Sequence, residues 1–139
     1  MIVNPQHPTT FEDIKNYIIH NSQKQPIFLK DMAYHCYEYL IEDRDFLINS
    51  THTFIIRDPA KSVPSYYFLD SNITEDELGY RQQYDLFQKI TEFSGKVPIL
   101  IDADDLQRYP NKILSSYCNQ LNLAFMPKVF EWKQFYDQQ

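Results

Sequence analysis

The chain has 139 residues, of which 43% are hydrophobic, and its formal net charge at pH 7 is −6. This length predicts one domain with a sizeable core, the apolar content excludes a disordered chain, and the acidic balance argues against a general nucleic-acid binder. No apolar run approaches the roughly 20 residues of a membrane-spanning helix, and the N-terminus lacks the features of a signal peptide, so we expect a cytoplasmic protein.

Cysteine, histidine and glycine contents restrict the chemistry further. Cys36 and Cys118 fall within expected helices, which favours two buried, reduced thiols. The four histidines lack metal-ligand spacing, so we expect no metal. With only two glycines, the chain cannot form a glycine-rich phosphate loop.

Helical and strand-like segments alternate along the first half of the chain. Thr10 is a plausible N-cap, and Phe11, Ile14 and Ile18 recur at helical spacing after it. Pro59 fits the first turn of a later helix, whereas Pro64 lies further in and predicts a kinked or short helix. The expected elements are a helix 11–21, a strand 27–29, a helix 32–41, a short helical piece 42–48, a strand 51–56 and a helix 59–67.

The second half begins with a capping-box pattern. Thr74 and Glu77 have the spacing of reciprocal N-terminal caps, and they predict the longest helix, which runs to about Phe93. Gly95 is the expected C-cap. A strand 97–101, a helix 109–121 and an aromatic, partly helical tail 126–139 follow.

Three short apolar strands, each followed by a helix, predict an α/β fold with a short parallel sheet between helical layers, a three-layer αβα arrangement in one domain, 1–139. Ligands of such sheets bind at the carboxyl ends of the strands. Those ends are the polar segments Lys30-Asp31, Arg57-Asp58 and Asp102 to Asp105. The aspartates fit either Mg²⁺ binding or, as we favour, capping of the following turn or helix.

The segment Thr51 to Tyr67 is the one that points to a definite ligand. A β-branched and aromatic run ends at Arg57, a proline turn opens a helix, and Ser65 follows eight residues after the arginine. Arg57 offers a bidentate contact to a phosphate, Ser65 a hydroxyl, and the helix start free N–H groups. The alternative is that Arg57 pairs with a carboxylate and Ser65 is a helix-surface residue.

These residues carry a resemblance to the sulfotransferase family, whose P-loop NTPase-like fold binds 3′-phosphoadenosine-5′-phosphosulfate (PAPS). IIRDPAKSVPSYY resembles the family motif in which an arginine and a serine contact the 3′-phosphate of the cofactor, and these positions are Arg57 and Ser65. IFLKDMAYH and IDADDL resemble two further family segments, in the same order. The resemblance covers residues 26–132 and implies a nucleotide cofactor, PAPS or its product 3′,5′-adenosine bisphosphate (PAP).

The resemblance also has gaps. No segment matches the family's phosphate loop or its C-terminal basic loop, so we expect a domain truncated at both ends. Lys30 aligns with a catalytic-site cation, whereas the family's catalytic histidine falls at Met32, which leaves His35, one helical turn on, as a substitute base. Whether the isolated chain is an active enzyme stays open.

Three functions remain open. The first is a sulfotransferase-like protein, a fragment or half of a split enzyme, that binds PAPS or PAP and serves an unidentified hydroxyl or amine acceptor. The second is a non-catalytic interaction module, a homo-oligomer or one half of a complex, on a degenerate sulfotransferase fold. The third is an unrelated phosphate-ester enzyme that uses Asp102 or Asp104. The aromatic tail, residues 125–136, fits core packing or an interface.

Overall fold

The computed structural model describes residues 9–130. The helices are α1 (Phe11–Ser22), α2 (Ala33–Glu42), α3 (Arg44–Ile48), α4 (Pro59–Leu69), α5 (Glu75–Leu78), α6 (Tyr80–Ser94), α7 (Ala103–Arg108) and α8 (Pro110–Gln120), with a 3₁₀ helix over Pro127–Phe130. The strands are β1 (Thr53–Ile56) and β2 (Ile99–Asp102). Within 9–130, no helix is both long and apolar enough to cross a membrane.

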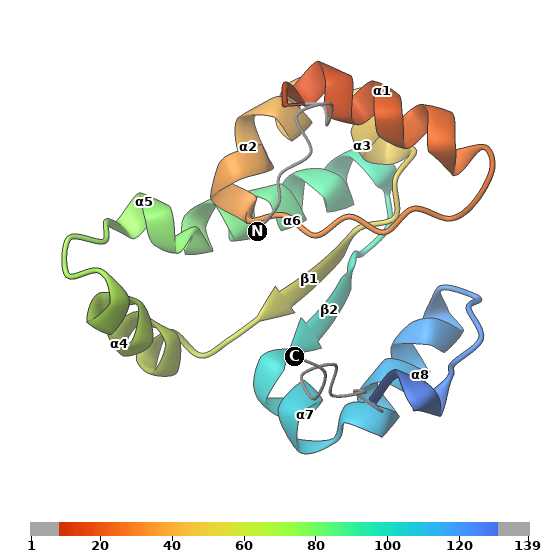
Figure 1. The fold of residues 1–139 in the computed structure, drawn as a ribbon. Helices are drawn as coiled ribbons and strands as arrows, with labels where there is room; N and C mark the ends of the chain where they lie inside the picture. The colour runs from red at the N-terminus through yellow and green to blue at the C-terminus, as the bar shows by residue number, and fades with distance from the viewer. Residues whose placement is uncertain (1–8, 131–139) are drawn as a thin grey trace, which may run out of the picture.

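The two strands form a parallel pair between layers of helices (Figure 1). In the register Thr53 faces Ile99 and Ile56 faces Asp102. Phe54 packs edge-on against Phe87 of α6, with 5.6 Å between ring centroids. On the other face of β1, the Tyr117 hydroxyl of α8 donates to Thr53 Oγ1 over 3.4 Å. Because successive strand residues point to opposite faces, these contacts place α6 and α8 on opposite sides of the sheet, as the αβα prediction requires.

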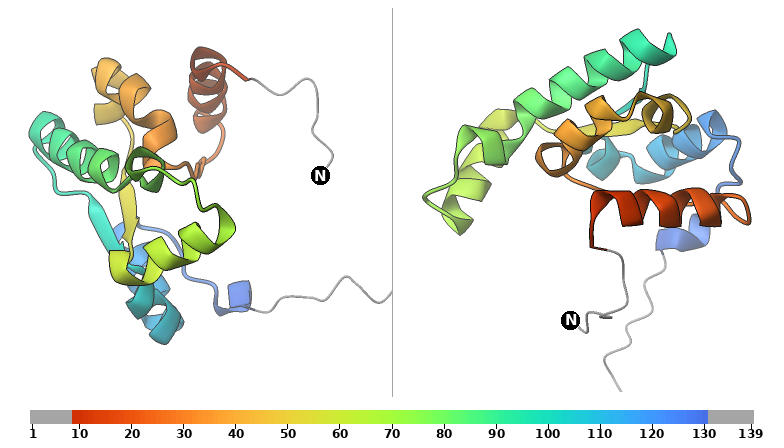
Figure 2. Two further views of the ribbon diagram at one scale, coloured as in Figure 1. Left: turned by 90° about the vertical axis from the view of Figure 1, so that its left-hand side faces the viewer. Right: turned by 90° about the horizontal axis from the view of Figure 1, so that it is seen from above.

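The prediction of a third strand, 27–29, is wrong. This segment is irregular and pairs with neither strand in the described part of the chain. Phe28 is 76% exposed and Leu29 57% exposed, so the apolar run has no sheet to bury it. Figure 2 shows it as an extended connection between α1 and α2.

The long helix predicted from Thr74 is broken at Gly79. The capping box forms as expected, with the Thr74 hydroxyl accepting from Glu77 N and Glu77 accepting from Thr74 N. Gly79 then adopts a left-handed φ of 72°, and it is both the C-cap of α5 and the N-cap of α6. Gly95, also left-handed at φ 67°, ends α6 as predicted.

The remaining helices follow the sequence closely. Thr10 caps α1 by accepting from Asp13 N over 3.2 Å. Pro64 lies inside α4 without ending it. Helix α7 was not predicted, since the helix expected after the strand 97–101 begins only at Tyr109. The tail beyond residue 130, including Trp132, lies outside the described residues.

The core lies between β1, α2, α3 and α6. Its buried apolar side chains in residues 9–130 are Leu47, Phe54, Leu86 and Ile90, with half-buried aromatic and aliphatic neighbours around them. Lys15 of α1 forms an ion pair with Asp43, which joins the first helix to the turn between α2 and α3. The pair raises the pKa of Lys15 and lowers that of Asp43, chiefly through their shared hydrogen bond. Such a small core leaves sixteen large apolar side chains of this region exposed.

Candidate functional site

The carboxyl ends of β1 and β2 lie side by side, as the parallel pairing requires. Ile56 pairs in register with Asp102, so Arg57 leaves the sheet beside the start of α7. Arg57 is exposed, and its charge reaches Asp104, where it helps to lower the pKa of that carboxyl. Two of the three predicted polar strand ends therefore meet at one edge of the sheet (Figure 1).

The start of α4 does not offer the free N–H groups that the sequence analysis expected. Asp58 is the N-cap, and its carboxylate accepts from Ala60 N over 2.9 Å. Pro59, at the first helical position, has no N–H. Lys61 N and Ser62 N donate to the Asp58 carbonyl, over 3.0 and 3.1 Å. The chain's own aspartate thus takes the anion position at this helix end.

Two serines of α4 have contrasting environments. Ser62 is buried, and its hydroxyl is hydrogen-bonded to the Asp58 carbonyl over 3.0 Å and to the Tyr80 hydroxyl of α6. Ser65, almost one turn further along, is exposed, and its hydroxyl has no hydrogen-bond partner within residues 9–130. Ser62 therefore fixes α4 against α6, while Ser65 is available to a ligand.

An ion pair joins the two strand ends. Lys61 of α4 is hydrogen-bonded to the Asp104 carboxylate of α7, across 43 positions of sequence. This hydrogen bond raises the pKa of Lys61 and lowers that of Asp104, and the charges of Arg57 and Arg108 lower the Asp104 pKa further. A shallow pocket of about 300 Å³ lies here, lined by Lys61, Asp104, Gln107 and Arg108.

The neighbouring aspartate serves the backbone. Asp102 is the N-cap of α7, and its Oδ1 accepts from Asp104 N over 2.7 Å and from Asp105 N over 3.3 Å. This confirms the capping role favoured from the sequence. The described residues contain no group of three or more His, Cys, Asp or Glu side chains arranged to hold a metal ion.

The two predicted catalytic residues make only local contacts in the described part of the chain. Lys30 Nζ lies 3.5 Å from the Met32 sulfur, and His35 Nδ1 lies 3.5 Å from Asp31 Oδ1. The His35 side chain is 58% exposed and its ring packs against Tyr34, with 4.1 Å between centroids. No described contact therefore joins the third predicted strand end, Lys30-Asp31, to the other two.

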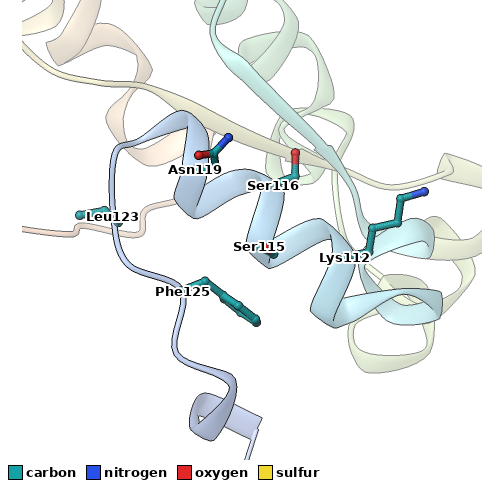
Figure 3. Close-up of a pocket in the computed structure, with 6 residues that line it drawn as sticks. All are labelled: Lys112, Ser115, Ser116, Asn119, Leu123 and Phe125. Atoms are coloured by element: carbon teal, nitrogen blue, oxygen red, sulfur yellow. The ribbon is translucent and has the colours of Figure 1, made fainter.

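A larger hollow lies elsewhere, between α8 and the segment that follows it. Its volume is about 470 Å³, and it is lined by Lys112, Ser115, Ser116, Asn119, Leu123 and Phe125. Figure 3 shows the polar residues on α8, with Phe125 beneath the helix. None of the predicted catalytic or cofactor-binding residues lines it.

Sequence reasoning missed three residues that shape the site, namely Lys61, Tyr80 and Arg108. A signal for Lys61 was present, since it lies four residues from both Arg57 and Ser65 and so shares a helix face with the serine. Tyr80 and Arg108 carry no such signal, because their roles depend on how α6 and α7 pack.

The chain is similar in sequence to known proteins. A family model described as the sulfotransferase domain matches residues 2–136. Two curated Arabidopsis thaliana proteins, the branched-chain-amino-acid aminotransferase-like proteins 2 and 1, are each 28% identical over 89 residues. That alignment covers 64% of this chain but only 16% of either relative.

No solved structure matches the chain. The sulfotransferase model, by contrast, spans nearly the whole sequence and includes Arg57, Ser65 and both strand ends. The chain belongs to the sulfotransferase domain family.

Proposed function

We propose that this protein binds the 3′-phosphate of PAPS or PAP through Arg57 and Ser65. The observation that carries the proposal is the position of Arg57, exposed at the carboxyl end of β1 and beside the carboxyl end of β2. Ligands of parallel α/β sheets bind at this edge. An arginine there supplies a planar pair of donors that matches two phosphate oxygens.

The environment of α4 supports Ser65 rather than Ser62 as the second ligand. Both hydroxyls are polar and close in sequence, but Ser62 is buried and already hydrogen-bonded to Asp58 and Tyr80. Recruiting Ser62 would break a buried hydrogen bond, which costs about 1–3 kcal/mol. Ser65 is exposed and incurs no such cost.

The surroundings also fit a dianionic phosphate. The whole chain has a net charge of −6, yet Arg57, Lys61 and Arg108 bring three cations to the strand ends. These cations share the edge with the carboxylates of Asp58, Asp102, Asp104 and Asp105, so direct contacts with the individual cations, and not the net charge of the edge, favour an anionic ligand. The free cysteines fit a reducing compartment, and we propose the cytoplasm.

For the sulfuryl transfer step, we propose Lys30 as the cation for the leaving group and His35 as the base for the acceptor. A histidine can accept a proton near neutral pH, and a lysine can stabilise developing negative charge. Since the contacts of both residues are local, binding is the function that the geometry supports best. PAPS supplies the transferable sulfuryl group; the acceptor class is a hydroxyl or an amine.

Isothermal titration calorimetry with PAP tests the binding proposal. We expect saturable binding to the wild type, weaker binding by at least tenfold for Arg57→Ala, and a smaller loss for Ser65→Ala. Ser62→Ala is not a suitable control, because it disturbs the contact with α6; Ser71→Ala, in the loop after α4, is the matched serine. AMP, which lacks the 3′-phosphate, should bind no better to the wild type than to Arg57→Ala. No PAP binding at millimolar ligand, or equal binding by Arg57→Ala, would refute the proposal.

A second candidate is a protein-interaction module that forms a homodimer. It is favoured by three consecutive apolar residues at the end of α4, Tyr67, Phe68 and Leu69, which are 60%, 89% and 79% exposed. Contiguous exposed apolar surface of this kind marks association sites. Light scattering tests it: we expect a dimer that Phe68→Asp converts to a monomer, and a wild-type monomer at all concentrations would exclude it.

A further inference from the structure

Lys61 lies midway between the two proposed phosphate ligands in the sequence. Arg57, Lys61 and Ser65 are spaced by four residues, and Lys61 and Ser65 are both in α4. Residues four apart on a helix are neighbours on one face, about 6 Å from each other. A phosphate that contacts Ser65 therefore lies against the helix face that also carries Lys61.

The phosphate also needs this lysine, because the helix end is occupied. The Asp58 carboxylate accepts from Ala60 N, and the Asp58 carbonyl accepts from Lys61 N and Ser62 N. A phosphate cannot use these amides without displacing the cap. Recognition of the dianion then rests on side chains, and the cations beside Arg57 at the strand ends are Lys61 and Arg108.

In the free protein, a carboxylate is paired with Lys61. Asp104 accepts from Lys61, and it lies close enough to Arg57 and Arg108 for both charges to act on it. Asp104 and Arg108 are also four residues apart on α7. The ion pair is only partly shielded, with side chains 53% and 32% exposed, so water and solutes reach it.

We propose that Arg57, Lys61 and Arg108 form one anion-binding cluster, that the Asp104 carboxylate is its internal counter-ion, and that the nucleotide phosphate displaces this carboxylate from Lys61. This inference rests on the proposed function. It adds Lys61 as a third phosphate ligand and Asp104 as a residue that opposes binding. Because a ligand must displace the Asp104 carboxylate, the site is also selective for dianions. A monoanion would interact with these cations little more strongly than the carboxylate that it replaces.

The test compares PAP affinity across charge variants by calorimetry. Lys61→Ala should raise Kd about tenfold, the effect of losing one charge-assisted hydrogen bond. Asp104→Asn, which is nearly isosteric, should lower Kd by about three- to tenfold, since it removes the competitor. Arg108→Ala should weaken binding less than Lys61→Ala, because Lys61 makes the direct contact with Asp104.

The ion pair Lys89–Glu92 on α6 provides matched controls. It is also an exposed lysine–carboxylate pair, with Nζ and Oε2 3.2 Å apart, and no described contact joins it to the strand ends. Lys89→Ala and Glu92→Gln change the net charge by the same amounts as the test variants. Neither should change the Kd for PAP by more than about twofold, the screened effect expected of a distant exposed charge.

Each outcome decides a different question. Weaker PAP binding by Lys61→Ala together with tighter PAP binding by Asp104→Asn supports the cluster. PAP binding that depends on Arg57, with Lys61→Ala and Asp104→Asn both unchanged or matching the α6 controls, overturns the cluster and leaves the proposed function standing. No PAP binding by the wild type or by Asp104→Asn overturns both. Circular dichroism of each variant checks that it is folded.

Discussion

Gly79 and Gly95 form a natural matched pair for measuring what one close contact contributes to this fold. Both are left-handed helix C-caps, with φ of 72° and 67°, and both donate to a carbonyl in the preceding helix over 3.0 Å. A Cβ at Gly79 would lie 3.1 Å from Tyr34 Cδ1 and 3.7 Å from Tyr34 N. A Cβ at Gly95 would meet nothing within 4 Å.

The magnitudes follow from this difference. Gly95→Ala should cost about 1 kcal/mol, since an L-residue in the left-handed region is strained by about 1–2 kcal/mol and the less flexible unfolded chain offsets part of it. Gly79→Ala carries the same cost plus about 1–3 kcal/mol for overpacking against Tyr34, about 2–4 kcal/mol in total. Against a domain stability of about 5–15 kcal/mol, the second variant is severely weakened.

Urea unfolding followed by circular dichroism measures both losses. In a Tyr34→Ala background, where the ring is absent, the two glycine substitutions should cost nearly the same, because only the backbone strain remains. Equal losses in the wild-type background, or a difference that persists without the Tyr34 ring, would refute the reasoning.

Two further predictions concern titratable groups. Burial raises the pKa of the Cys36 thiol to about 11, so about 0.1% of it is thiolate at pH 8. Iodoacetamide should therefore modify Cys36 slowly in the native protein and rapidly in urea, as measured by peptide mass spectrometry. Fast alkylation of the native protein would contradict this. The hydrogen bond from Lys15 lowers the pKa of Asp43 below its usual 3.8, so the stability that it contributes is present above that pH and is lost as pH falls further. The urea midpoint should therefore fall between pH 5 and pH 2 more steeply in the wild type than in Lys15→Ala; identical pH profiles would count against the pair.

The elements that the sequence predicted well are those determined by neighbouring residues. Thr10, the Thr74–Glu77 box and Gly95 act on backbone groups within four positions, and all three form as predicted. Gly79 has the same local chemistry as Gly95, but it lies inside a continuous helical pattern, which concealed the break. The strand 27–29 failed for the opposite reason: an apolar run becomes a strand only when another strand pairs with it, and that depends on the whole sheet.

The candidate site shows the same difference between features set by neighbouring residues and features set by distant ones. Arg57 could be placed from the sequence because it directly follows an apolar strand, and its position at the sheet edge is a consequence of parallel pairing. What surrounds it depends on distant residues: Lys61 meets Asp104 across 43 positions, and Ser62 meets Tyr80 across 18. The second contact is what leaves Ser65, rather than Ser62, facing outward on α4.

The Asp58 cap determines how the site can recognise an anion. The sequence pattern suggested a phosphate held by a helix N-terminus, as in many α/β proteins, but Asp58 in the same motif caps that end. A motif with glycine or an apolar residue at the cap would leave Ala60 N available to a ligand, whereas here the Asp58 carboxylate accepts from it. The binding energy for a phosphate must then come from Arg57 and its neighbours, so affinity should follow side-chain charge at the strand ends. Asp104, which the sequence marked only as part of an acidic strand end, becomes the residue that limits this affinity.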